Sequence, residues 1–294
     1  MAEFFQQVVA GLGSGSIYAA LALALVLIHR ATGVINFAQG EMAMFTTYIA
    51  WTLTANHGWN YWPAFAATLL FAFALGVAIH TVVIRPVERA SVLTVVIMTI
   101  GLVLTFNGLA SLIWSGEVRP FPSPFPNETW LIGGVAISQQ DLGTLGVVLA
   151  LVAILWAFFQ FTKIGLALRA SALNPDASRL VGVRVRWMLA IGWGLAATLG
   201  AVAGMLAAPT IFLDPNMMQA ILIYAFAAAV LGGIDSPFGA VVGGLMLGVG
   251  LNLISAYVDF VGADLRLPVA LLIILVVLLV RPAGLFGKVV TRRV

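Results

Sequence analysis

The chain of 294 residues is 62% hydrophobic and only 9% charged, whereas a soluble domain carries about 25% charged residues. This composition excludes an ordinary soluble protein and indicates a membrane protein. Without cysteine, the chain can form neither a disulfide nor a thiolate metal site. The net charge of +3 does not require a nucleic-acid partner, because the placement of the basic residues explains it. The N-terminus lacks a basic segment and a cleavage site, so we expect no removable signal peptide.

A helix needs about 20 apolar residues to cross a bilayer core of about 30 Å. Nine stretches are candidates: 4–28, 42–55, 61–84, 90–114, 142–168, 187–213, 215–234, 236–258 and 267–280. The second is long enough only if 33–41 is included, and the last spans if Arg266 and Arg281 reach the interfaces. The pair 215–234 and 236–258 meets at a tight polar turn, as two full spans or as shorter, partly re-entrant helices. We predict an all-α polytopic membrane protein with eight or nine such helices in a single transmembrane domain, 1–294.

The basic residues predict the orientation of the chain. Alternating spans from an external N-terminus put most lysines and arginines on one side, namely Arg30, Arg85, Arg89, Lys163, Arg169, Arg179, Arg184, Arg186, Arg281, Lys288, Arg292 and Arg293. Arg119, Arg266 and most of the acids fall on the other side. Because cytoplasmic loops are enriched in Lys and Arg, we predict that the C-terminus is cytoplasmic.

The polar stretch "GVINFAQGEM", residues 33–42, lies between two apolar runs. A carboxylate at membrane depth is a functional-site hypothesis by default, and irregular backbone at that depth must be buried or line a cavity. Asn36, Gln39 and Glu41 therefore form either a structural network, with Arg30 or His29 as expected partners, or part of a translocation path. The distribution of charges predicts that they lie at the cytoplasmic edge, near an inner gate.

Two further features concern contacts between helices. Small residues at four-residue spacing permit close helix approach, and they occur at Gly200 and Gly204, Gly239 and Gly243, Gly244 and Gly248, and in the run Gly11, Gly13 and Gly15. Single amides in apolar spans, Asn107 and Asn252, are expected to hydrogen-bond between helices.

The two longest predicted loops lie on opposite sides. The external loop, 115–141, has four prolines within 120–126, which favour extended backbone and indicate a rigid connector or a docking surface for an external partner. In the internal loop, 163–186, a short amphipathic helix is predicted over 171–180. Asn174 would cap it, Pro175 and Asp176 suit its first turn, and Gly182 would end it. It either lies among lipid headgroups or docks on a cytoplasmic partner.

No enzyme motif or nucleotide-binding fingerprint occurs in the sequence. We therefore expect a protein that is not an enzyme and holds no cofactor. Any active transport must take its energy from another chain or from an ion gradient.

Residues 165–183, "GLALRASALNPDASRLVGV", resemble the cytoplasmic coupling loop of bacterial ABC-importer permeases. The segments "GSGSIYAALALALVL", "GVINFAQGEM", "RPVERAS", "AAAVLGGIDSPFGAVVGGLMLG" and "RPAGLFG" extend the resemblance over nearly the whole chain. They resemble the H-type permease subunit of the branched-chain amino acid (Liv-type) ABC transporter family. Members of that family often carry His where this chain has Gln39, so a proton-shuttling role is not expected at this position.

This resemblance implies an importer of branched-chain or related hydrophobic amino acids in the bacterial inner membrane. The implied partners are a second permease subunit, two cytoplasmic ATPase subunits that bind the ATP, and a periplasmic substrate-binding protein. The residues implied to couple the chain to an ATPase are Gly165, Arg169, Ala170, Asn174, Asp176, Ala177, Leu180 and Gly182. The alternative is an ion-coupled secondary transporter of small amino acids or amides.

Overall fold

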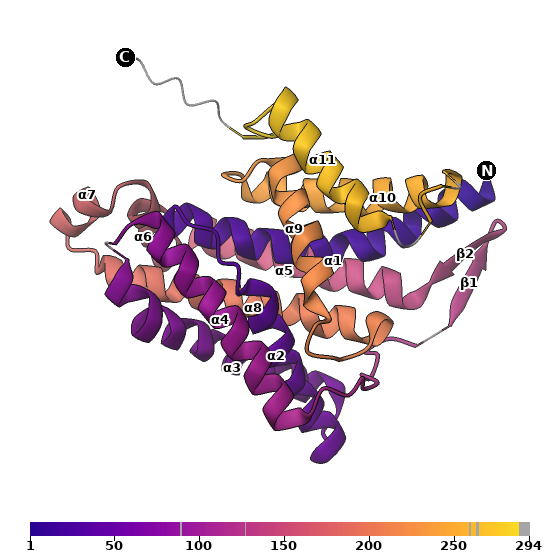
Figure 1. Cartoon of the computed structure of the whole chain (residues 1–294), viewed down its shortest axis with the longest axis horizontal. Coiled ribbons are helices and arrows are strands. Elements are labelled where there is room, and N and C mark those ends of the chain that lie inside the picture. The colour runs from indigo at the N-terminus through magenta and orange to yellow at the C-terminus, as the bar shows by residue number, and fades with distance from the viewer. Residues whose placement is uncertain (89, 127, 259, 263–264, 288–294) are drawn as a thin grey trace.

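The computed structural model describes residues 1–88, 90–126, 128–258, 260–262 and 265–287. Arg89, Lys288, Arg292 and Arg293, which contribute to the predicted orientation, lie outside the described residues. Within the described ranges the chain is a bundle of helices with a single β-hairpin (Figure 1).

The helices follow the predicted apolar stretches in order. They are α1 (Ala2–Thr32), α2 (Gln39–Trp51), α3 (Tyr61–Ile79), α4 (Val92–Trp114), α5 (Gln139–Phe161), α6 (Lys163–Leu173), α7 (Pro175–Leu180), α8 (Val185–Ile211), α9 (Met218–Gly232), α10 (Pro237–Tyr257) and α11 (Arg266–Val280). Short π-helical segments, Thr52–Asn56 and His80–Ile84, extend α2 and α3, and a 3-10 turn, Arg85–Val87, follows the second.

Six of the described helical segments are long and apolar enough to cross a membrane, beginning at Ala2, Tyr61, Val92, Gln139, Val185 and Pro237. Helices α9 and α11 are apolar but shorter, with 15 residues each. This pattern confirms a multi-pass membrane protein, and the number of eight or nine spans stays a prediction.

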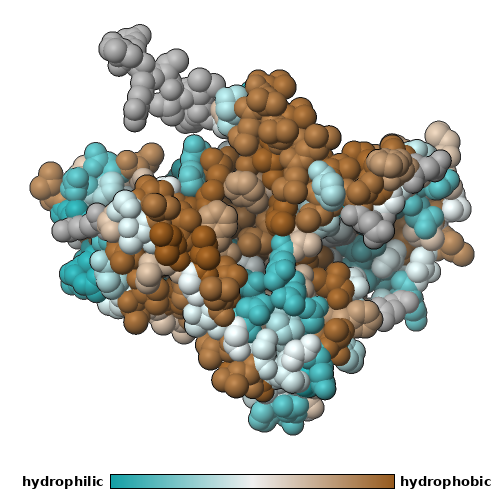
Figure 2. All heavy atoms as spheres, in the orientation of Figure 1, coloured by the Kyte–Doolittle hydropathy of each residue, from teal (hydrophilic) through white to brown (hydrophobic). Residues whose placement is uncertain are grey.

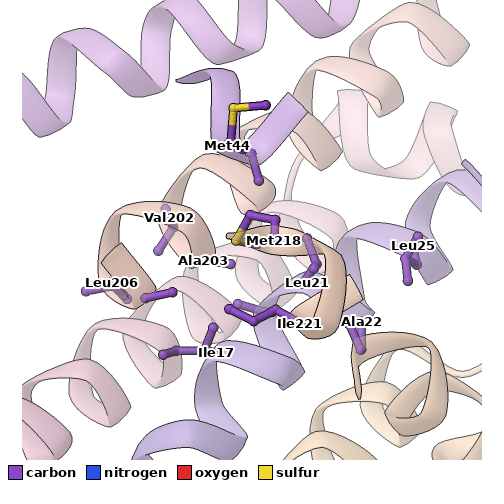
Figure 3. Close-up of a cluster of buried hydrophobic side chains, with 14 of the residues drawn as sticks. Ile17, Leu21, Ala22, Leu25, Met44, Val202, Ala203, Leu206, Met218 and Ile221 are labelled. Carbon is purple, nitrogen blue, oxygen red and sulfur yellow. The ribbon is translucent and has the colours of Figure 1, made fainter. Parts of the chain in front are cut away.

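Helices α1 and α8 form the centre of the bundle. Helix α1 has 31 residues, a length of about 46 Å, and its buried residues from Ile17 onward surround the helix rather than line one face. A helix that is apolar all round is suited to burial. Figure 3 shows Ile17 and Leu21 of α1 meeting Leu206 of α8 and Ile221 of α9 in one cluster.

Glycines allow α1 and α10 to cross closely. A Cβ atom at Gly244 would meet the backbone of Ala19, and one at Gly248 would meet the backbones of Gly11 and Gly15. The predicted packing role of these small residues is therefore confirmed. Gly243 packs in the same way against Ala228 and Gly232 of α9, and Gly204 packs against α2.

The internal loop differs from its prediction in where its helices begin and end. The apolar stretch 142–168 is not one helix, because α5 ends at Phe161 and Thr162 caps a separate helix, α6, by accepting a hydrogen bond from Gly165 N at 2.9 Å. The short amphipathic helix predicted over 171–180 is α7, but it begins only at Pro175. Residues 171–173 belong to α6 instead. In the predicted external loop, the prolines precede a β-hairpin that consists of β1 (Thr129–Ile132) and β2 (Val135–Ser138).

Candidate functional site

The break between α1 and α2 is built from the predicted polar stretch. Gly33 adopts a left-handed conformation, with φ of 72°, and ends α1 by donating from its N–H to His29 O at 2.7 Å. The chain is then irregular until α2 begins at Gln39. The side chain of Asn36 supports this turn, because its Oδ1 accepts from Ala38 N at 3.1 Å.

Gln39 fastens the break to α8. Its Nε2 donates to Ala196 O at 2.8 Å, and its Oε1 accepts from Asn36 Nδ2 at 3.1 Å. Gly200 leaves the space for this side chain, since a Cβ there would meet Gln39 Nε2. The predicted polar network is present, but Gln39 bonds to Ala196 rather than to Arg30 or His29, the partners expected from the sequence. His29 faces Asp235 instead, with Nδ1 3.5 Å from Oδ1.

The break packs against the middle of α8, and its expected position at a cytoplasmic edge stays a prediction. Ala196, the partner of Gln39, lies near the middle of α8. Residues 33–38 are irregular, so the chain that precedes α2 is non-helical where Gln39 meets α8.

Glu41 lies two residues further, in the first turn of α2, and is 4% exposed. It takes part in none of the ion pairs found among the described residues, and there its Oε2 accepts no hydrogen bond. Burying a carboxylate without a cation costs several kcal/mol. The Asn107 amide and the Asp214 carboxylate are among the polar groups near it.

Asn107, predicted to hydrogen-bond between helices, extends this polar region. Its Nδ2 donates to Pro215 O at 2.9 Å and to Asn216 Oδ1 at 3.1 Å, in the connection between α8 and α9. Gln219 Nε2 donates to the same Asn216 oxygen at 2.8 Å. The prediction from sequence singled out Asn107 but missed its neighbours in 214–219, which lie more than 100 residues away in the chain.

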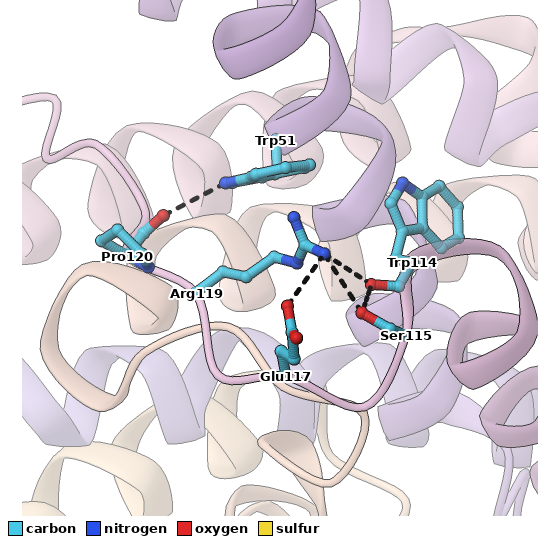
Figure 4. A network of polar contacts seen from close by, with 6 residues as sticks. All are labelled: Trp51, Trp114, Ser115, Glu117, Arg119 and Pro120. Atoms are coloured by element: carbon cyan, nitrogen blue, oxygen red, sulfur yellow. Dashed lines mark hydrogen bonds and ion pairs between the residues drawn. The ribbon is translucent and has the colours of Figure 1, made fainter.

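A second cluster closes the C-terminal end of α2 (Figure 4). The Arg119 guanidinium lies 4.6 Å from the centre of the Trp51 ring, and its Nη2 donates to Trp114 O at 2.7 Å. Glu117 Oε2 is 3.7 Å from the same nitrogen. The backbone of Arg119 also exchanges two hydrogen bonds of 2.9 Å with Leu213. This cap joins α2, α4 and the connection between α8 and α9.

The internal loop forms the third feature, at the end of the bundle opposite the β-hairpin (Figure 1). Asn174 caps α7, since its Oδ1 accepts from Ala177 N at 2.9 Å. Asp176 pairs with Arg179 at 2.8 Å, and Gly182 follows the helix with a φ of 84°. The predicted cap, first turn and terminator are thus all in place.

The other residues implied in coupling lie on α6 and α7. Gly165 packs so closely on the backbone of Phe158 and Phe159 that a Cβ would collide, and Arg169 Nη1 lies 3.4 Å from Gln160 Oε1. Ala170 and Ala177 lie on α6 and α7, respectively. Leu180 is 89% exposed, and Leu173 and Val181 are exposed near it. Exposed apolar side chains on and beside a capped helix make a surface suited to a partner.

Comparison with known proteins identifies the family. Residues 7–280 match the family described as "Branched-chain amino acid transport system / permease component", and the chain belongs to this family. It is 31% identical to the high-affinity branched-chain amino acid transport system permease protein LivH of Escherichia coli, over 97% of this chain and 96% of that protein. It is 32% identical, over the same shares, to the corresponding protein BraD of Pseudomonas aeruginosa.

More distant comparisons agree. A probable branched-chain amino acid transport permease protein LivH of Methanocaldococcus jannaschii is 29% identical over 91% of this chain and 87% of that protein. Among solved structures, "PsaBC from Streptococcus pneumoniae in complex with Fab" superposes with a TM-score of 0.50 and 13% identity. It covers 93% of this chain and 91% of that chain, and at this identity it shows a shared fold.

Proposed function

We propose that the chain is a permease subunit of an ATP-driven importer that carries branched-chain or related hydrophobic amino acids into the cytoplasm. Membership of the family over residues 7–280, and the substrates named for LivH and BraD, carry this proposal. The remaining components are a second permease subunit, two cytoplasmic ATPase subunits and a periplasmic binding protein. The complex lies in the bacterial inner membrane, with the C-terminus in the cytoplasm.

Helices α6 and α7 are the surface that receives the ATPase. The exposed Leu180 projects from a short helix whose two ends are fixed by the Asn174 cap and by Gly182. Gly165 holds α6 against the end of α5, so a displacement of α7 is passed to a long apolar helix. Such a connection converts ATPase closure into a movement of the spans.

The translocation path includes the polar break between α1 and α2. Asn36 and Gln39 are held in a network that fixes the start of α2 against α8, which makes them supporting residues of the path. Glu41 takes no part in that network, and its carboxylate lines the path. Alternating access would open this region first to one side of the membrane and then to the other.

Co-purification with the ATPase subunits tests the coupling surface. Leu180→Arg, Arg169→Glu and Ala177→Arg should each reduce the ATPase recovered with the permease. Leu131→Arg is the matched control. Leu131 is nearly as exposed as Leu180, at 80%, but it lies on the β-hairpin at the opposite end of the bundle. Full ATPase recovery and substrate-stimulated hydrolysis with all three loop variants would refute the assignment.

A further inference from the structure

The buried carboxylate of Glu41 is the feature that the fold does not explain. It is buried at the start of α2, outside the hydrogen-bond network that holds Asn36 and Gln39. Among the described residues no Lys or Arg forms an ion pair with it. A charged group in this position is costly to keep, so a role in binding would account for it better than packing does.

The surroundings of Glu41 favour a positively charged hydrogen-bond donor. Beside its burial, the polar groups near it include an amide and a second carboxylate, Asn107 and Asp214. The oxygens of both carboxylates can only accept hydrogen bonds when ionised. A carboxylate ligand would be repelled here, whereas an ammonium group would supply both the missing charge and up to three donors.

This polar region reaches the surface of the chain. Asn216 and Gln219 are exposed, and Asn107 and Asp214 are partly exposed. Figure 2 shows hydrophilic side chains gathered in the lower centre of this face, amid hydrophobic surface. Asn107 therefore joins the buried start of α2 to amides and a carboxylate at the surface.

Aromatic side chains border the same position. Phe45, one turn after Glu41 on α2, lies on the same side of the helix. Its ring centre is 5.2 Å from that of Phe106, the neighbour of Asn107, and 5.4 Å from that of Trp114. A ligand with an ammonium group at Glu41 would therefore place an adjoining apolar group against these rings.

We propose that the Glu41 carboxylate binds the α-ammonium group of the transported amino acid, with Asn107 beside it and the Phe45–Phe106–Trp114 cluster next to the apolar side chain. This inference rests on the proposed function and assigns the substrate contact within it. It makes Glu41 a binding residue for an α-amino acid with a hydrophobic side chain. Gln39 and Asn36 stay in their structural role.

Thiol labelling tests the contact directly, because the chain has no cysteine of its own. The variant Glu41→Cys is assembled with the ATPases, the second permease and the binding protein, all freed of reactive cysteines. A cationic methanethiosulfonate should modify it, and saturating L-leucine with ATP should slow the modification at least about tenfold. Thr47→Cys is the control, since Thr47 is buried on α2 against Gly204 and should not react.

Leucine that leaves the rate at Glu41→Cys unchanged would overturn the proposal. If Glu41→Cys does not assemble, the same protection is measured at Asn107→Cys, where unchanged reactivity has the same meaning.

Transport by Glu41→Gln provides the second readout. The leucine moved per ATP hydrolysed should fall at least about 30-fold, the effect of leaving a buried charge unpaired, while hydrolysis stimulated by the binding protein continues. Glu128→Gln makes the same chemical change on the exposed external loop and should transport normally. Normal transport by Glu41→Gln refutes the substrate contact, and a parallel loss of hydrolysis assigns Glu41 a structural role instead. Failure of the unaltered complex to transport leucine refutes the proposed function itself.

Discussion

Gln39 holds the irregular start of α2 in place. Its Nε2 donates to Ala196 O and its Oε1 accepts from Asn36 Nδ2, and both hydrogen bonds are buried. Irregular backbone within a membrane bundle persists only where protein satisfies its polar groups. A neutral side chain with both functions suits this position, and the hydrogen bonds require no proton to move.

Replacing Gln39 by Leu should destabilise the folded chain by about 1–3 kcal/mol, because Asn36 Nδ2 loses its partner in a buried site. Gln39→His, which keeps a donor and an acceptor, should lose less. The thermal unfolding temperature of each variant in detergent measures the difference. Equal unfolding temperatures for Gln39→Leu and the unaltered chain would show that the network contributes nothing.

At the scale of elements, the crossing of α1 and α10 depends on a line of glycines. Gly248→Ala should destabilise the chain by about 1–3 kcal/mol, the usual cost of overpacking, because the added methyl would meet the backbone of Gly15. Gly250→Ala is the matched control two residues away in the same helix, where nothing lies within 4 Å of the added atom. Denaturation of the two variants in the same detergent separates them, and equal stability would argue against the crossing.

Helix α7 has only six residues, so its cap matters more than in a long helix. Asn174→Ala should cost the helix about 1 kcal/mol and raise amide hydrogen exchange over residues 175–181. Asn174→Asp, which also accepts from the backbone, should stay close to the unaltered chain. If exchange over this range is the same in both variants, the cap does not stabilise α7.

The cap at the C-terminal end of α2 depends on the shape of arginine rather than on its charge alone. Arg119→Lys keeps the charge but loses the planar group over Trp51 and part of its hydrogen bonding. We expect faster hydrogen exchange in 115–121 and in 212–216, the two segments joined by the Arg119–Leu213 bridge. Arg266→Lys, at the start of α11, is the control and should leave exchange in both segments unaltered. Unchanged exchange in Arg119→Lys would show that the guanidinium does not hold the cap.

At the scale of the whole molecule, the sequence allowed most of the architecture to be predicted. The apolar stretches locate the helices because a bilayer demands them, and the Asn174–Pro175 pair locates α7 because caps are local. The small residues likewise mark the crossings. These features depend on residues that are close together in the chain.

The partner of Gln39 and the surroundings of Glu41 could not be predicted in this way. Gln39 meets Ala196, and Asn107 meets Asn216, and such pairs depend on how distant helices pack. The length of α5 was overestimated for a different reason. The apolar residues continue through Thr162 into α6, and only the cap at Thr162 marks the change.

On the proposed function, this chain moves hydrophobic amino acids with energy supplied by partner ATPases. ATP-dependent uptake of labelled leucine into proteoliposomes that contain the full complex tests it most directly. We predict uptake that requires ATP and binding protein, persists without any ion gradient, and is lost with Leu180→Arg but kept with Leu131→Arg. Uptake driven by a proton or sodium gradient in vesicles that contain this chain without the ATPases would contradict the account and identify a secondary transporter.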